Sequence, residues 1–141
     1  MWTERSVKSQ HIQFALAGIF LGLGGWCIID PDGVERLVLR PEFQHLSATS
    51  GLLIACFGAQ AVLVAIVIAF SKFTPRTFLI FGVLGSLPFF VFNWYFVFTV
   101  EMFTPFMLID FVGNLSILIC CLIGYILCRI EVRQSGLEHR N

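Results

Sequence analysis

The sequence contains few charged residues. Only 13% of its 141 residues are Asp, Glu, Lys or Arg, whereas 57% are hydrophobic. Soluble domains are typically about a quarter charged, so this chain has too few charges to cover a water-exposed surface. Its formal net charge is zero, which provides no basic face for a nucleic-acid partner. The composition therefore predicts that much of the surface contacts a lipid bilayer.

Ligands for metals and cofactors are also scarce. All three histidines (His11, His45 and His139) lie outside the long apolar runs or at their ends, so a haem or di-iron site inside those runs has no histidine ligand. The five cysteines show no CxxC spacing, which argues against a zinc site and a disulfide scaffold. No P-loop, GxSxG or HExxH motif occurs. The sequence thus indicates no metal, cofactor or catalytic residue, and it favours a non-catalytic role.

What the chain has instead is long apolar runs. Four of them reach the roughly 18 residues that a membrane-spanning helix needs. They cover residues 12–29, 48–70, 75–100 and 105–128. Apart from Arg76 near the start of the third run, they contain no Lys or Arg, and Asp110 is their only acid. The pattern predicts four transmembrane helices.

Short turns separate the last three runs. Thr74-Pro75 opens the third run and Thr104-Pro105 opens the fourth. Thr is a good helix cap, and Pro suits the first helical position, so both turns are tight. Tight turns make the last three helices antiparallel neighbours. We therefore expect an all-α fold, a single-domain antiparallel bundle of four transmembrane helices, with a short tail over residues 129–141.

Basic residues are unequally distributed between the two ends of this bundle. If the N-terminus is inside, the outer connections hold only Arg36 and Arg40, within the long connection 30–47. The inner side then holds Arg5, Lys8, Lys72, Arg76, Arg129, Arg133 and Arg140. Lys and Arg accumulate in cytoplasmic loops, so we expect both termini to be cytoplasmic. Within the outer connection, residues 34–40 fit either a short interfacial helix or an ordered loop.

Three polar residues lie in the outer half of the predicted helices. Asp110 and Asn114 are four residues apart and share a helix face, and Asn93 lies in the outer third of the preceding helix. An ionisable side chain costs about 2.5–3.5 kcal/mol at mid-bilayer, so it is expected to face the bundle. We therefore expect these side chains to meet in one polar pocket, with Arg36 or Arg40 folded over it as counter-ion.

Aromatic residues are dense in the third run. Trp94 and its aromatic neighbours lie beside Asn93, and an apolar wall with a few polar groups is typical of quinone, sterol, isoprenoid or lipid sites. The same aromatic residues fit plain packing or a belt at the membrane surface. The polar residues likewise fit simple hydrogen bonding between helices. Both interpretations remain open on the sequence.

Small residues are spaced for close contact between helices. Gly18, Gly22 and Gly25 share one face of the first predicted helix, and Gly58 lies on a small-residue face of the second. Gln60 lies roughly opposite that face of the second helix. This placement fits a second copy or another membrane subunit packed against Gln60, and it also fits a Gln60 side chain that faces the pocket.

Several features of this layout occur together. They are Asp30-Pro31 at the end of the first helix, Arg36 and Arg40 in the outer connection, Gly51 opening the second helix, and Asp110-Phe111-Val112-Gly113-Asn114 opening the fourth. In these features, over about residues 12–129, the chain resembles the small four-helix bacterial membrane proteins grouped as DoxX-like. The resemblance implies a four-helix bundle in the bacterial inner membrane and, as in some members, association with quinone-linked redox systems. The sequence has no cofactor motif of its own.

These observations predict a small multi-pass membrane protein that binds a hydrophobic ligand, such as a quinone or lipid, or a partner subunit in its outer-leaflet half. The candidate binding residues are Asp110, Asn114, Asn93, Arg40, Arg36 and Trp94. One alternative is a membrane enzyme that uses Asp110 as acid or base on a lipid-like substrate. Another is a small homodimeric transporter, in which Gln60 would matter.

Overall fold

The computed structural model describes residues 8–138, without the side chains of residues 135–138, and is mostly helical. Its long helices are α1 (Ser9–Ile29), α3 (Ala48–Phe70), α4 (Pro75–Trp94) and α5 (Leu108–Glu138). Shorter elements are helix α2 (Pro31–Val38), the 3₁₀ turns η1 (Pro41–Phe43) and η3 (Pro105–Met107), and the π-helical turn η2 (Tyr95–Thr99). Residues 8–138 contain no β-strand, and one isolated antiparallel bridge joins Leu39 to Phe103.

Each long helix is long and apolar enough to cross a bilayer, α4 together with η2. The prediction of an all-α fold with four membrane-spanning helices is confirmed. Some boundaries differ from the sequence-based ones: α1 already begins at Ser9, and α4 ends at Trp94, after which η2 continues to Thr99. α5 begins at Leu108 after η3 and continues to Glu138 instead of ending near residue 128. The residues after Cys128 include Glu131, Arg133 and other good helix formers, so most of the expected tail is helical.

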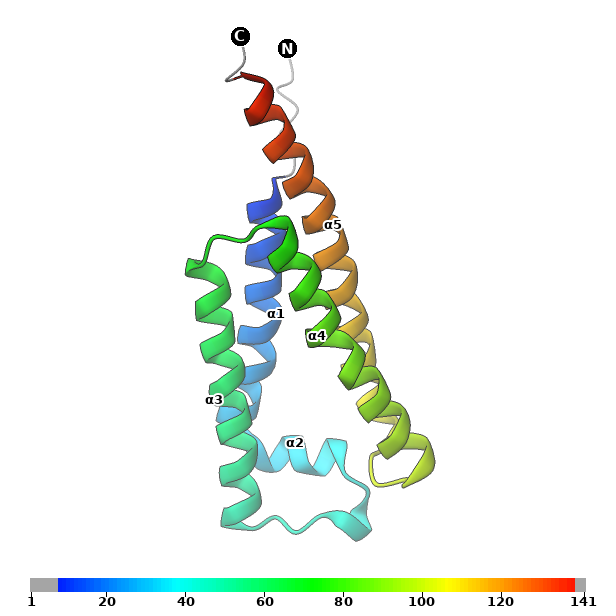
Figure 1. The fold of residues 1–141 in the computed structure, drawn as a ribbon. Helices are drawn as coiled ribbons and strands as arrows, with labels where there is room; N and C mark the ends of the chain where they lie inside the picture. Colours follow the sequence, from blue (N-terminus) through cyan, green and yellow to red (C-terminus); the bar gives the residue numbers. More distant parts are fainter. Residues whose placement is uncertain (1–7, 139–141) are drawn as a thin grey trace, which may run out of the picture.

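The long helices form two antiparallel pairs. α1 packs along α3, α4 packs along α5, and α1 also contacts α5 (Figure 1). The expectation that all of the last three helices are neighbours is wrong for α3 and α4, which the short turn joins only at their ends. The pairs lie close together where α1 begins and α5 ends, which we call the tail end. They diverge toward the α2 end, where α2 reaches from α3 to η3.

The buried core lies in the half of the molecule nearer the tail end. Leu16, Ile68, Phe78, Ile117 and Cys121, drawn from all four long helices, are each at most 3% exposed. Lipid tails are as apolar as these side chains, so the gain from burying them comes from dispersion and close packing. The rest of the helix surface is largely apolar and exposed, as contact with a bilayer requires.

Polar contacts join the helices at the tail end. Gln13 of α1 is buried, and its Nε2 donates to the backbone oxygens of Ile68 and, at 2.6 Å, Ser71. The last carbonyls of α3 therefore find a donor that the helix itself does not supply. The backbone N–H and the hydroxyl of Ser9 donate to the carboxylate of Glu131, at 2.8 and 2.6 Å. These contacts hold the start of α1 against α3 and α5.

Glycine sets the approach of α1 to α3. A Cβ on Gly24 would lie 2.6 Å from the backbone oxygen of Gly58, and a Cβ on Gly58 would lie 2.6 Å from that of Gly24. The expected glycine contact on α1 through Gly18, Gly22 and Gly25 is wrong, because a Cβ on any of them would meet nothing within 4 Å. The expected small-residue face of α3 is correct, since Gly58 is buried against α1.

The connection after α1 forms helix α2, one of the two structures expected for it, and it is tied to the connection between α4 and α5. The backbone N–H of Arg40 donates to Met102 O at 3.0 Å, and that of Thr104 donates to Val38 O at 2.8 Å. These bonds join the two connections into one layer that covers the α2 end.

Candidate ligand site at the α2 end

Asp110, Asn114 and Asn93 meet beneath this layer. Asp110 lies in the first turn of α5, Asn114 one turn later, and Asn93 in the last turn of α4. The Nδ2 atoms of Asn93 and Asn114 both donate to Asp110 Oδ2, each at 2.8 Å, and Asn114 Nδ2 also donates to Asp110 O at 2.8 Å. The expectation that these side chains meet is confirmed. We call them the Asp110 cluster.

The cluster stabilises a carboxylate without a cation. Two amide N–H groups converge on one oxygen of Asp110, and the first turn of α5 places the carboxylate near the positive end of the helix dipole. Within the described part of the chain, no Lys or Arg lies within ion-pair distance of Asp110. Neighbouring amides, instead of the expected arginine, therefore bind this carboxylate.

Some acceptors in the cluster are unused. Asp110 Oδ1 makes no hydrogen bond to any described residue. Asn93 is 1% exposed, and its Oδ1 is buried without a hydrogen-bond partner. Ser86, two turns before Asn93 on the same face of α4, is also fully buried with an unpaired hydroxyl. The buried face of α4 thus carries hydrogen-bonding atoms that have no partner among the described residues.

The structure does not bring Arg36 or Arg40 to the Asp110 cluster. Arg40 Nη1 forms an ion pair with Glu101 Oε2 at 3.0 Å, and its Nε donates to Phe103 O at 3.3 Å. The bridge between the two connections directs Arg40 to this segment. The Arg36 side chain is exposed and makes no contact of this kind with a described residue. The predicted counter-ion role is therefore wrong for both.

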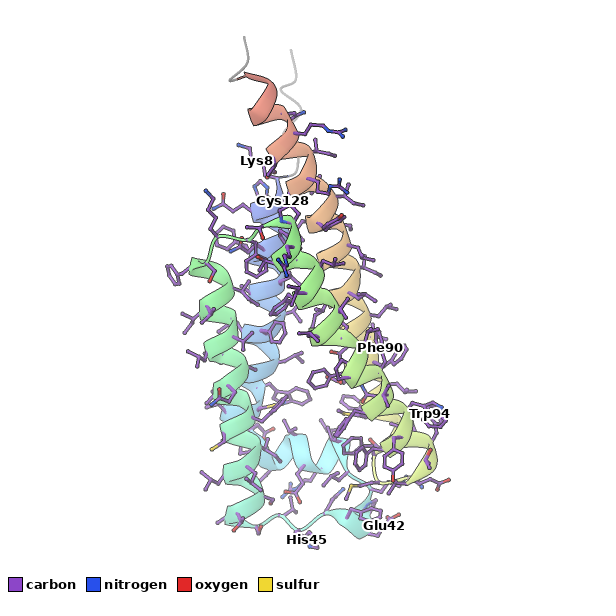
Figure 2. The ribbon with its side chains drawn as sticks, viewed as in Figure 1. Lys8, Glu42, His45, Phe90, Trp94 and Cys128 are labelled. Carbon is purple, nitrogen blue, oxygen red and sulfur yellow. The ribbon has the colours of Figure 1, made fainter. Side chains whose placement is uncertain are left out.

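Trp94 also lies apart from the cluster. It is 61% exposed and its side chain projects away from the bundle (Figure 2). Nearby aromatic residues pack against one another: the ring centroid of Phe96 lies 4.6 Å from that of Phe92 and 5.3 Å from that of Phe103. Packing explains these rings, and an exposed Trp near a helix end suits the membrane surface.

Glu35 is a buried group that the sequence analysis did not single out. It is 2% exposed, and its Oε1 accepts from the backbone N–H groups of His45 at 2.6 Å and Leu46 at 2.9 Å. The nearby Ser50 hydroxyl, followed by the Leu46 and His45 N–H groups, holds the pKa of Glu35 below its ordinary value. Glu35 lies one turn after Pro31 and three residues before Val38, so helical periodicity places it on the inward face of α2. This periodicity is the sequence signal that could have indicated its burial.

The described residues contain no group of three or more His, Cys, Asp or Glu side chains that could hold a metal ion. Comparisons with models of protein families, with curated proteins and with solved structures found no match to this chain. The DoxX-like resemblance therefore stays a prediction from the layout of the sequence.

Proposed function

We propose that this small membrane protein binds the polar head of a hydrophobic molecule at the Asp110 cluster, without catalysing a reaction on it. The observation that supports this proposal is a carboxylate held by two amides beside a buried amide oxygen, Asn93 Oδ1, that has no partner. Buried polar groups in proteins are nearly always hydrogen-bonded, and an unpaired one costs about 1–3 kcal/mol. A ligand that donates hydrogen bonds would remove this cost.

The unused atoms define the chemistry of the proposed ligand. Asp110 Oδ1 and Asn93 Oδ1 both accept hydrogen bonds, so the head group must carry O–H or N–H donors. A lipid alcohol, an amine or a hydroquinone fits this requirement. An oxidised quinone offers only carbonyl acceptors, and it fits less well.

Native mass spectrometry of the full chain, released from membranes in a mild detergent, tests the proposal. We expect a bound amphiphile on the wild-type protein. Asp110→Asn keeps the size of the side chain, but if its remaining oxygen stays on the two amides, an NH2 donor replaces the acceptor Oδ1. The variant then loses a ligand hydrogen bond to a charged group, which is worth about 1.5–3 kcal/mol. The affinity for the amphiphile should therefore fall by about ten- to a hundredfold.

Asp32→Asn is the control, because Asp32 is an exposed carboxylate on α2 at the same end of the molecule. It should leave the bound amphiphile unchanged, and both variants should elute from gel filtration like the wild type. Equal retention of the amphiphile by Asp110→Asn and the wild type would exclude the cluster as the site. If Asp110→Asn retains the amphiphile but no longer changes it chemically as the wild type does, the result would instead favour the alternative of a membrane enzyme.

We further propose that the α2 end faces the outside of the cell and the tail end faces the cytoplasm. Of the seven described Lys and Arg residues, only Arg36 and Arg40 belong to the α2 end, and five belong to the tail end: Lys8, Lys72, Arg76, Arg129 and Arg133. The positive-inside rule places such an end in the cytoplasm. Tags at both termini that stay inaccessible to protease in intact cells would support this orientation, and digestion of either tag would contradict it.

A second copy of the chain is the partner that α3 favours. Gln60 is exposed, roughly midway along α3, and its amide makes no hydrogen bond to a described residue. An amide without a partner in hydrocarbon costs several kcal/mol. Because an amide has both donors and an acceptor, two Gln60 side chains can satisfy each other across a twofold axis. We therefore propose a homodimer through this face of α3.

A further inference from the structure

A groove lies between the start of α4 and the last turns of α5, away from the Asp110 cluster. It is open to the surroundings and has a volume of about 910 Å³. Its basic lining comes from Arg76 on α4 and from Arg129 and Arg133 on α5. Exposed apolar side chains, including Leu79 and Ile126, continue the groove toward the middle of the membrane. The groove is therefore basic at the end of the spans and apolar along them.

The positive charge of the groove is not neutralised within the described part of the chain. None of the three arginines forms an ion pair with a described acid. Among the described acidic side chains, only Glu131 belongs to this end, and Ser9 binds both of its oxygens on the side of α1. A groove with three guanidinium groups and no bound carboxylate attracts an anion.

One of the arginines is held in position. Arg129 Nη1 donates to the hydroxyl of Tyr125 at 3.0 Å, and its guanidinium carbon lies 5.6 Å from the centre of the Tyr125 ring. Tyr125 itself lines the groove. This contact restricts the long side chain without using its charge, so Arg129 loses less entropy when it binds an anion.

We propose that this groove binds an anionic phospholipid, with its phosphate at Arg76, Arg129 and Arg133 and an acyl chain along Leu79 and Ile126. The match between a basic rim and an anionic head, above walls that suit an acyl chain, favours a lipid over a soluble anion. Basic grooves between transmembrane helices at the cytoplasmic surface are typical sites for such head groups. The site would fix this end of the helix pair α4–α5 in the anionic leaflet.

Competition between two lipids tests this proposal. The purified full chain is mixed with equal amounts of phosphatidylglycerol and phosphatidylcholine that carry identical acyl chains, and bound lipid is measured by native mass spectrometry. We expect the wild type to retain phosphatidylglycerol at least about tenfold better. Each of Arg76→Gln, Arg129→Gln and Arg133→Gln should reduce that retention about fivefold, since each cationic side chain near a membrane contributes about that factor.

Controls separate the charge from the fold and the lipid from its phosphate. Arg36→Gln removes an exposed arginine at the opposite end and should leave the preference unchanged. Arg129→Lys keeps the charge and should retain most of the preference, even if Arg129→Gln disturbs folding. Millimolar inorganic phosphate should not displace the lipid. Equal retention of the two lipids by the wild type, displacement by phosphate, or equal effects of Arg36→Gln and Arg129→Gln would overturn the proposal.

Discussion

Glu35 occupies a position in α2 at which an amphipathic helix normally buries an apolar side chain. Its carboxylate accepts two backbone N–H groups from residues 45 and 46, where the chain turns from η1 toward α3. Leu46 has a positive φ of 41°, a conformation that is unfavourable for a leucine. The buried charge therefore stabilises an otherwise costly turn of the layer over the Asp110 cluster.

The Glu35 contact makes the stability of this layer depend on pH. The folded-state pKa of Glu35 is lower than its ordinary value of 4.5, so the ionised form favours the folded state. The contribution is complete above about pH 4.5 and is lost as the pH falls through the lowered folded value. We expect Glu35→Gln to lower the melting temperature by several degrees at pH 7, and the difference from the wild type to shrink below pH 4.5.

Thermal unfolding in detergent at a series of pH values measures this effect. Glu42→Gln is the control, because Glu42 is exposed on η1 in the same connection (Figure 2). It should melt like the wild type throughout. A constant difference between Glu35→Gln and the wild type at every pH would contradict an ionised Glu35 as the stabilising group.

Sequence reasoning predicted the Asp110 cluster and missed what surrounds it. The spacing of Asp110 and Asn114, and the depth of Asn93, follow from helix geometry and the cost of burying polar groups in lipid. The place of Arg40 depends instead on a bridge between two connections that lie far apart in the sequence. Local sequence patterns do not encode such a contact. The prediction of Arg40 as a counter-ion for Asp110 was therefore wrong.

At the scale of helices, α1 and α3 approach each other at a single pair of glycines. Gly24→Ala would place a methyl group 2.6 Å from Gly58 O and 2.9 Å from Ala61 Cβ. Backbone atoms cannot move aside cheaply, so the two helices must separate. We expect the unfolding free energy to fall by about 1–3 kcal/mol, as measured by denaturant titration in bicelles.

Gly22→Ala is the matched control, because a Cβ at this position of the same helix would meet nothing within 4 Å. It should be as stable as the wild type or slightly more so, given the better helix propensity of Ala. If the two variants lose the same free energy, the effect belongs to α1 itself and not to its contact with α3.

The glycine contact also shows the limit of a face assigned from the sequence. Gly18, Gly22 and Gly25 form a regular stripe, yet the contact uses Gly24, whose neighbour Gly25 makes none. Helix periodicity indicates which residues share a face, but the partner helix decides which face is used. The small-residue face of α3 was assigned correctly, since Gly58 and Ala65 there are buried.

At the scale of the whole molecule, the number of spans was predictable and their pairing was not. Run length and hydropathy suffice for four helices, because hydrocarbon thickness fixes the required length. The short turn between α3 and α4 suggested adjacent helices, but a turn restrains only the two ends that it joins. Contacts of α1 with both α3 and α5 instead decide the arrangement, with α3 at one edge of the molecule (Figure 1).

The edge position of α3 leaves Gln60 facing outward, and this leads to a prediction for the assembly. Cys56 is a free, exposed cysteine one turn before Gln60, so it shares that face. In a homodimer through this face, the two Cys56 residues lie near each other, and mild oxidation of native membranes should link two chains. Cys56→Ser should abolish the covalent dimer, since Cys56 is the exposed cysteine, whereas Cys120 is partly buried and Cys27, Cys121 and Cys128 are buried.

The amide of Gln60 is expected to contribute to this association directly. Hydrogen bonds between membrane helices are worth about 0.6 kcal/mol on average and up to about 1.7 kcal/mol, so Gln60→Leu should weaken dimerisation by about three- to twentyfold. Ile66→Ala provides the comparison, because Ile66 is exposed about 120° around α3 from Gln60, and it should leave cross-linking unchanged. If Gln60→Leu cross-links as efficiently as the wild type, the Gln60 amide does not contribute to the interface. A wild-type chain that yields no covalent dimer in membranes would leave the outward amide of α3 facing lipid, and the homodimer proposal would fail.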